Sequence, residues 1–337
     1  MHVLNAFRCA TTVALFFGVL LATKAHDDEA KAMPEIAPMA DGVASLGAAV
    51  DGGWLYVYGG HTGKTHSYSN KQTSARFQRV DLKAGGEWED LPGGPGLQGL
   101  VLVAHGGKLY RIGGMGAKNE PGAKDDLYSS ADFARFDPGT KTWTDLAPLP
   151  EGRSSHGAAI VGDKIYVFGG WNLQGAMKDA RWQTEALVFD LSADKGGWEP
   201  IAKPPFERRA MSATAYDGKI YVTGGLTSRG GISQDVDVFD VESGNWSKGP
   251  EIPGMPMNGN GLAACGTEKA LYLSGMDGKV YRINKSKDGW DAVGKLAKPR
   301  IHHRLLNVGH TSFIAVGGAT MVGNLKSVDA VAFDGAH

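Results

Sequence analysis

The chain contains very little cysteine, with only Cys9 and Cys265 among its 337 residues. We expect Cys9 to leave with an N-terminal signal peptide, so Cys265 has no partner and an intramolecular disulfide is excluded. An excess of charge is also missing, because 35 Lys and Arg face 36 Asp and Glu, and no run of five like charges occurs. This balance argues against nucleic acid and anionic membrane surfaces as partners.

Long apolar runs are also missing, except for residues 10–22 near the N-terminus. Arg8 precedes that run, and Thr23-Lys24-Ala25 places small residues at positions −3 and −1 of a cleavage site. Because the run is too short to span a bilayer comfortably, it is typical of a signal peptide. We therefore predict a signal peptide over residues 1–25 and a secreted or periplasmic protein that begins at His26 and has no membrane span.

Helical periodicity is hard to find after residue 42, whereas glycine is abundant, with 49 residues. The glycines recur at fixed places in a pattern, which indicates tight turns rather than disorder. The stretch Gly162–Gly170 shows the unit: two turn-forming residues, strand-forming residues, then two glycines. Its glycine pair or an equivalent recurs every 43 to 56 residues, at Gly59-Gly60, Gly113-Gly114, Gly169-Gly170, Gly224-Gly225, Ser274-Gly275 and Gly317-Gly318.

Each of these units predicts a small antiparallel sheet. A strand precedes the glycine pair, and a third strand ends in an aromatic or aliphatic residue and Asp or Asn, as in Phe136-Asp137 and, in the sixth unit, Phe333-Asp334. A tryptophan opens the fourth strand of the first five units: Trp88, Trp143, Trp198, Trp246 and Trp290. A period near 50 favours one closed array, so we predict a single all-β domain over residues 26–337.

The sixth unit has no such tryptophan, which would leave an exposed sheet edge. The N-terminal segment Met33–Gly42 matches Trp143–Gly152 place for place, with Met33 where the tryptophan would stand. We therefore predict that residues 33–39 form a strand that completes the last unit and closes the ring.

The glycine pair, the following aromatic-Asp and the tryptophan resemble kelch repeats, over residues 33–334. The resemblance implies a six-bladed kelch β-propeller. It says little about function, because kelch propellers include peptide-binding modules, glycan-related proteins and a few enzymes.

Residues that deviate from the repeat on one face of the propeller are the candidates for function. The segments that lead into the innermost strands carry Arg153, Arg208 and Arg300 at equivalent places. Such a basic channel mouth suits a carboxylate, sulfate or phosphate, although each arginine would equally suit pairing with a neighbouring Asp. Long loops in the first three units add aromatic and polar side chains that suit a sugar ring. The predicted ligand-binding residues are Arg153, Ser155, His156, Arg208, Asn260, Arg300, His302, His303, His61, Trp171 and Arg229.

Two further functions stay open. The chain is similar to secreted bacterial N-acetylneuraminate epimerases, and this resemblance implies a sugar mutarotase or epimerase. Leu226 stands where their acid/base glutamate follows a glycine pair, and only Arg229 carries over loosely, so His156 or His303 would carry the proton. A protein-interaction scaffold is the other alternative, and would show as an apolar patch.

A metal site is the weakest hypothesis. His61, His302 and His303 fall on the same face, but they lack a local spacing that would place two of them on one ion. We predict no metal and no cofactor, and a monomer that binds a small molecule, a glycan or a protein partner.

Overall fold

The computed structural model describes residues 33–193, 196–309 and 312–334. The predicted signal peptide, residues 1–25, lies outside these ranges. Met33 and the residues after it belong to one compact unit. Within the described ranges, no helix is long and apolar enough to cross a membrane.

The first four repeats each form a four-stranded antiparallel sheet, which we call blades 1 to 4. Each blade is written from its innermost to its outermost strand. They are β1 (Gly47–Asp51), β2 (Trp54–Tyr58), β3 (Phe77–Asp81) and β4 (Glu89–Leu91); β5 (Val101–His105), β6 (Lys108–Ile112), β9 (Phe133–Asp137) and β10 (Thr142–Asp145); β11 (Gly157–Val161), β12 (Lys164–Phe168), β16 (Ala186–Asp190) and β17 (Trp198–Ile201); and β19 (Ser212–Tyr216), β20 (Lys219–Thr223), β22 (Val236–Asp240) and β23 (Trp246–Lys248).

Blades 5 and 6 depart from this pattern. Blade 5 consists of β24 (Ala263–Gly266), β25 (Leu271–Ser274), β26 (Lys279–Ile283) and β27 (Trp290–Lys295), and β33 (Ala332–Phe333) adds a fifth strand beside β27. Blade 6 has three strands, β28 (Arg304–Gly309), β29 (Ser312–Val316) and β32 (Val328–Ala330). The prediction that Phe333-Asp334 ends the third strand of blade 6 is therefore wrong, because the chain leaves that blade after Val331 and pairs with blade 5 through Ala332 and Phe333.

Short strand pairs stand outside the blades. They are β7 (Met115–Ala117), β8 (Leu127–Ser129), β13 (Trp171–Asn172), β14 (Gln174–Gly175), β15 (Arg181–Trp182), β18 (Arg208–Arg209), β21 (Leu226–Thr227), β30 (Ala319–Thr320) and β31 (Gly323–Asn324). Two 3-10 turns, Met177–Asp179 and Pro256–Gly259, are the helical segments of the described chain.

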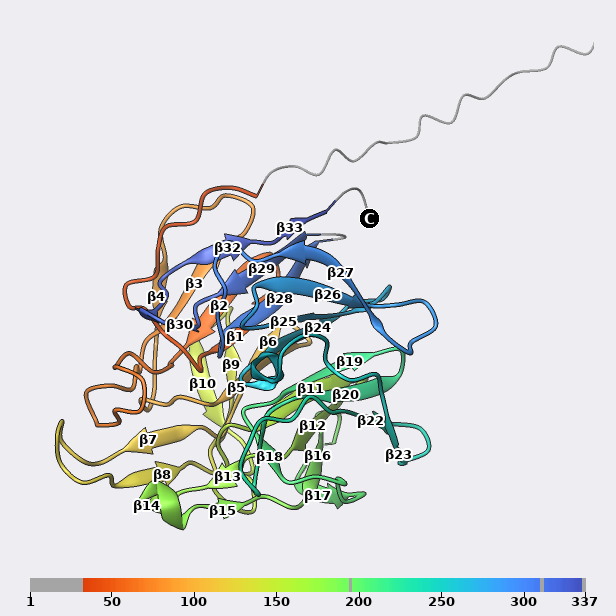
Figure 1. Ribbon diagram of the computed structural model, residues 1–337. Coiled ribbons are helices and arrows are strands. Elements are labelled where there is room, and N and C mark those ends of the chain that lie inside the picture. The colour runs from red at the N-terminus through yellow and green to blue at the C-terminus, as the bar shows by residue number, and fades with distance from the viewer. Residues whose placement is uncertain (1–32, 194–195, 310–311, 335–337) are drawn as a thin grey trace, which may run out of the picture. The chain divides into compact units, whose positions relative to one another are not determined.

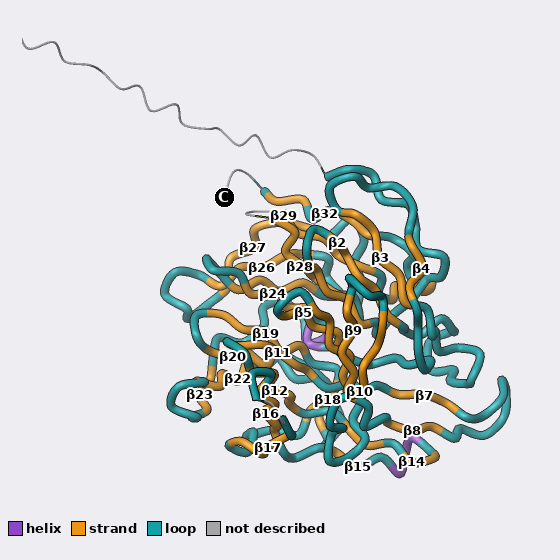
Figure 2. Tube along the Cα trace, turned by 180° about the vertical axis from the view of Figure 1, so that it is seen from behind, coloured by secondary structure: helices purple, strands orange, loops and turns teal. Residues whose placement is uncertain are grey.

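The six blades form a closed ring. The innermost strands β1, β5, β11, β19, β24 and β28 each contact the next, and β28 contacts β1 again. Figures 1 and 2 show these strands gathered at the centre, from opposite sides. The predicted six-bladed all-β propeller is confirmed.

The glycine pairs let neighbouring blades approach closely. Gly169 and Gly170 have φ angles of 57° and 88°, which suit glycine. A Cβ on Gly169 would lie 2.4 Å from the carbonyl oxygen of Arg208 in the next blade. The repeated pair therefore serves packing between blades, as the repeat pattern indicated.

The outer tryptophans join each blade to the one before it. Trp143 Nε1 donates to Pro92 O at 2.8 Å and Trp198 Nε1 donates to Ala147 O at 3.1 Å. Trp88 Nε1 of blade 1 donates to Ala37 O at 2.8 Å. The carbonyl of Ala37 thus accepts the tryptophan hydrogen bond of blade 1, just as the carbonyl of Ala147 accepts that of blade 3.

The predicted closing strand is not formed among the described residues 33–39. That segment is extended, and Met39 N donates to Lys326 O of blade 6 at 2.8 Å. Closer to the terminus it turns to blade 1, where Ile36 forms a single parallel bridge with Gly86. Because the segment leaves blade 6 after one bond, it does not extend the ladder of β32. Closure of the ring by an N-terminal strand stays unconfirmed.

A belt of backbone hydrogen bonds encircles the channel mouth. One residue of each blade has a left-handed φ between 53° and 58° and donates its N–H to the carbonyl of the equivalent residue in the blade before, at 2.6 to 3.2 Å. We call these six residues the mouth ring: Ser45, Gly99, Ser155, Ala210, Gly261 and His302. Since Ser45 N donates to His302 O, this belt joins blade 6 to blade 1.

Candidate functional site

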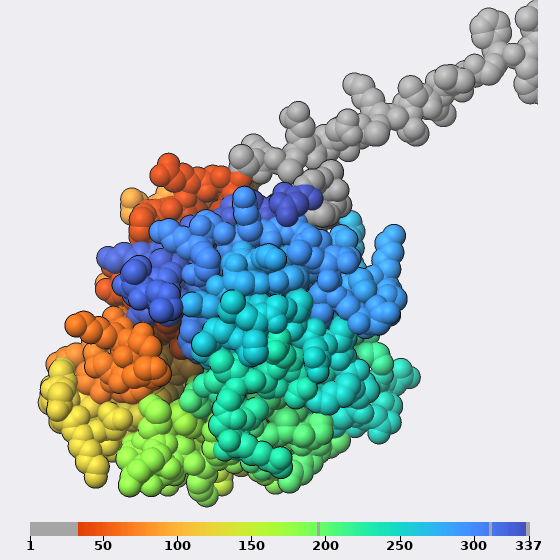
Figure 3. All heavy atoms as spheres, viewed as in Figure 1, coloured from red at the N-terminus to blue at the C-terminus, as the bar shows by residue number. Residues whose placement is uncertain are grey.

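A pocket of about 260 Å³ opens at the mouth ring, and all six ring residues line it. Figure 3 shows the surface hollowed where the orange, blue and cyan segments meet. The other walls come from the segments that lead into the inner strands, from the residues after the glycine pairs and from the loop after β2. This is the face on which the sequence placed the functional candidates.

Among the residues of the described chain that line this pocket, none is Asp or Glu. Cations and imidazoles are abundant, and they are Arg209, Arg304, His61, His66, His156, His302 and His303. A cavity with this lining attracts anions and lacks a carboxylate for general acid–base chemistry.

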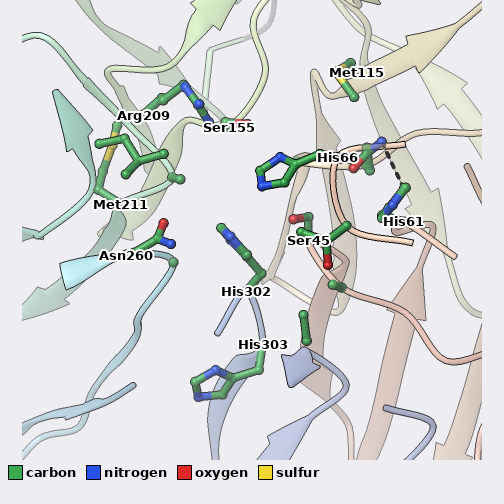
Figure 4. Close-up of a pocket in the computed structure, with 18 of the residues that line it drawn as sticks. Ser45, His61, His66, Met115, Ser155, Arg209, Met211, Asn260, His302 and His303 are labelled. Carbon is green, nitrogen blue, oxygen red and sulfur yellow. Dashed lines mark hydrogen bonds between the residues drawn. The ribbon is translucent and has the colours of Figure 1, made fainter. Parts of the chain in front are cut away.

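Arg209 is the guanidinium nearest the pocket's aromatic wall. Its Cζ lies 3.9 Å from the ring centre of Trp171 and 5.9 Å from that of Trp182. Stacking fixes the planar group without using its N–H donors. No acidic partner contacts Arg209 in the described structure, and burial lowers its pKa. In Figure 4 its side chain ends beside Ser155, at one edge of the pocket.

Arg304 is a second unpaired cation, at the inner end of the pocket. It begins β28, at a position that the other blades fill with small or medium side chains: Gly47, Val101, Gly157, Ser212 and Ala263. Its Nη2 donates to Leu100 O of blade 2 at 2.9 Å, so the side chain reaches past blade 1. Burial lowers the pKa of Arg304 to about 10.

His302 and His66 project into the cavity from opposite sides (Figure 4). Both have positive φ angles, 54° and 61°, which aim their side chains inward from a turn. Burial, and then the charge of Arg209, lowers the pKa of His302 to about 4. The imidazole of His302 is therefore neutral at pH 7, and the two guanidiniums supply the positive charge.

His156 and His303 occupy wedge positions, one residue after the mouth ring, where each side chain packs against the glycine pair of the preceding blade. The other blades use Leu46, Leu100, Met211 and Leu262 there. His303 bonds Ser274 Oγ through Nε2 at 2.8 Å, and Ser274 replaces the first glycine of its pair. Both ring nitrogens of His156 lack a partner in the described structure. The proton-carrying role predicted for His303 gains no support, because its Nε2 is already hydrogen-bonded to Ser274.

His61 holds its own loop. Its Nδ1 contacts Gln72 O and its Nε2 contacts Lys64 O, both at 3.1 Å. Both ring nitrogens are thus used by the loop that forms the wall of blade 1. Among the described residues, no group of three or more His, Cys, Asp or Glu is arranged to hold a metal ion.

The anion-binding role predicted for Arg153, Arg208 and Arg300 needs correction. The three arginines do occupy equivalent positions in their blades. Their side chains, however, are 3%, 1% and 0% exposed and point into the blades that carry them. Arg153 donates to Gly169 O and Glu185 O. Arg208 pairs with the buried Asp237, and Arg300 pairs with Asp329. None of the three lines the pocket.

Some of the remaining predicted ligand-binding residues line the pocket and one does not. Ser155, Asn260 and Trp171 line the pocket, whereas Arg229 is exposed in a turn and does not. Arg209 and Arg304 were missed. Aligning the repeats would have singled out Arg304 as the one large polar residue at its position, but nothing in the sequence separates Arg209 from Arg208.

Exposed apolar side chains lie on two segments that also reach the mouth. Met255 and Met257 precede β24, and Met321 and Val322 form the tip of the β30–β31 hairpin. They are the large hydrophobic residues that the described surface exposes. A protein partner would find its apolar contacts here.

Residues 99–318 match the model of the KLHDC2/KLHL20/DRC7 Kelch-repeats domain. The chain belongs to the kelch-repeat family. Kelch-like protein 35 of Mus musculus is 27% identical over 223 residues, which are 66% of this chain but 33% of that protein. Beta-scruin of Limulus polyphemus is 29% identical over 164 residues, 49% of this chain and 17% of that protein. The kelch chain thus spans a third or less of these relatives.

One similar enzyme is covered more fully. N-acetylneuraminate epimerase of Haemophilus influenzae is 26% identical over 333 residues, with 77% of this chain and 84% of the enzyme covered. The solved structure of YjhT superposes with a TM-score of 0.70 at 18% identity, over 89% of this kelch chain and 99% of that one. At that identity the superposition shows a shared fold.

Proposed function

We propose that this kelch propeller binds a small carboxylated sugar in the pocket at its mouth ring. The observation that carries the proposal is the charge of the lining. Arg209 lines the cavity without an acidic partner in the described structure, and no described lining residue is acidic. An unpaired guanidinium in a partly buried site gains most from a carboxylate, which it binds in a bidentate manner.

The other lining groups suit a sugar. Trp171 and Tyr68 add aromatic side chains to the lining, while Gln98, Asn260 and the mouth-ring serines offer amide and hydroxyl groups. Buried Asn260 Oδ1 and Trp171 Nε1 lack partners within the described structure. A volume of about 260 Å³ is at the small end for ligand pockets, which favours one sugar ring over an oligosaccharide. N-acetylneuraminate, which the similar enzyme's name specifies, is a carboxylated sugar of one ring.

Calorimetric titration with N-acetylneuraminate and glucuronate tests the proposal. We expect Arg209→Met to weaken binding by about 10- to 100-fold, the value of a charge-assisted pair. Arg229→Met is the matched control, because Arg229 is in the same blade but exposed outside the pocket. Equal affinities for the wild type and both variants would overturn the assignment of Arg209.

A mutarotase or epimerase is the second candidate. Its support is the coverage of 84% of N-acetylneuraminate epimerase. Because the described lining lacks a carboxylate, proton transfer would fall to an imidazole, and His302 and His66 are better placed than His303. Proton NMR of anomer exchange separates binding from catalysis. Exchange at the buffer rate with saturating protein would eliminate the enzyme, whereas acceleration lost in His302→Asn would establish it.

Export remains part of the proposal. It rests on the charge, apolar run and small residues of the first 25 positions. Mass spectrometry of protein recovered outside the cytoplasm should find His26 as the first residue. An intact Met1 on exported protein would contradict the cleavage site.

A further inference from the structure

Among the described arginines, Arg304 lies at the start of an innermost strand, and the sugar site proposed around Arg209 does not use it. Arg304 borders the pocket. Its one hydrogen bond is to the neutral carbonyl of Leu100, at 2.9 Å. Among the described residues, no carboxylate forms an ion pair with Arg304, whereas Arg208 pairs with Asp237 and Arg300 pairs with Asp329.

Arg304 is only partly exposed, and a charge in such a place is costly to leave without a counterion. A cation removed from water needs a counterion or several hydrogen bonds, and one carbonyl supplies little of either. The lowered pKa of Arg304, about 10, reflects this unfavourable environment. The five equivalent positions are occupied by nonpolar residues or serine, so packing of the channel does not require an arginine.

A second unsatisfied group borders the same cavity. His156 is 4% exposed, and neither ring nitrogen has a partner in the described structure. It stands where other blades use leucine or methionine. Its pKa is lowered to about 3, first by burial and then by the charges of Arg153 and Arg304. The neutral ring keeps one N–H donor.

We propose that the channel binds a small monovalent anion of the halide class, with Arg304 as the main ligand and the imidazole N–H of His156 as the second donor. The site is distinct from the sugar pocket's aromatic side, where Arg209 stacks on Trp171. Chloride would neutralise the buried cation and satisfy the orphan imidazole together. The proposal does not depend on the sugar.

Halide binding is measurable on the whole protein. Crystals grown without chloride and soaked in sodium bromide should give an anomalous bromine peak against the Arg304 guanidinium. In solution, sodium chloride and bromide should raise Tm by at least about 3 °C over sodium methanesulfonate at equal ionic strength. Absence of the bromine peak in wild-type crystals would overturn the proposal.

Variants assign the effect to its residues. Arg304→Met should abolish the halide-dependent rise in Tm, and His156→Leu should reduce it, since leucine fits the wedge position. Arg135→Met, on the exposed surface of β9, is the control and should keep the full rise. If Arg304→Met fails to fold, broadening of the ³⁵Cl NMR line in the wild type and in Arg304→Lys still decides; no broadening in either refutes the site.

A sugar carboxylate is the other source of the same chemistry. If the sugar's own carboxylate bound Arg304, soaking with N-acetylneuraminate would expel bromide, and Arg304→Met would abolish sugar binding. We expect bromide to remain and sugar affinity to change less than about 3-fold. Failure of the Arg209 variant affects the sugar proposal alone, so the two outcomes stay distinguishable.

Discussion

Replacing His156 by leucine should stabilise the protein. His156 is a buried imidazole with two unpartnered nitrogens at a wedge position where blades 1, 2 and 5 carry leucine. An unsatisfied buried polar group costs about 1–3 kcal/mol, and leucine removes that cost while it keeps the packing. In buffer without halide at pH 7, we expect the free energy of unfolding to rise by about 1–3 kcal/mol.

The difference should grow as the pH falls. The pKa of His156 is about 3 in the folded protein, against an ordinary value of 6.5 for histidine. Below pH 6.5 the unfolded chain therefore takes up a proton that the folded protein refuses, and the wild type loses stability as pH falls from about 6.5 toward about 3. Between pH 7 and pH 5 this loss amounts to about 2 kcal/mol, since each pKa unit is worth about 1.4 kcal/mol. In His156→Leu the free energy of unfolding should not show this fall, because leucine does not titrate.

Urea unfolding at pH 7 and pH 5 measures both effects. His105→Leu is the control, because His105 lies on the surface beside Asp163, at 2.8 Å, outside the wedge positions. Leu262→His makes the reverse change in blade 5 and should destabilise by about 2 kcal/mol or more. A His156→Leu variant less stable than the wild type at pH 7, or a gap that does not widen at pH 5, would refute the reasoning.

Two further outcomes test the fold. Arg208→Met should destabilise the protein by about 3 kcal/mol, because Asp237, 1% exposed, loses its buried partner; urea unfolding measures this, and sugar affinity in the folded variant should not change. Weaker sugar binding at unchanged stability would return Arg208 to the ligand site. Deleting residues 33–42 removes Met39, 1% exposed, and the acceptor for Trp88 Nε1, so Tm should fall by at least about 5 °C. Unchanged melting would show that the mouth ring alone closes the propeller.

The repeat spacing was enough to predict the blades. Glycine pairs and tryptophans have a fixed place in each unit, so their period indicated six sheets, and the structure confirmed them. The C-terminus was not predictable in the same way. Phe333-Asp334 copies the end of a third strand, yet Phe333 packs near Tyr272 and Phe313 and pairs with β27. Tertiary packing overrode the local pattern there.

The site was predictable in position but not in detail. The segments at a fixed distance before the glycine pairs lie on the face of the propeller where the pocket opens. That spacing could not show which of the two adjacent arginines faces the pocket: they lie on opposite faces of strand β18, with Arg208 buried in the blade and Arg209 in the pocket lining. Arg304 begins an innermost strand, so only an alignment of the six repeats distinguishes it from an ordinary strand residue.

The most direct test of the central claim compares N-acetylneuraminate with its methyl ester by calorimetric titration of the wild-type protein. The two sugars differ in the charge of one group, and the described pocket lining offers that group the guanidinium of Arg209 and no carboxylate. We predict that the acid binds at least about 10-fold more tightly than the ester. Equal binding of acid and ester, or binding of neither, would contradict a pocket built for a carboxylated sugar of this kind.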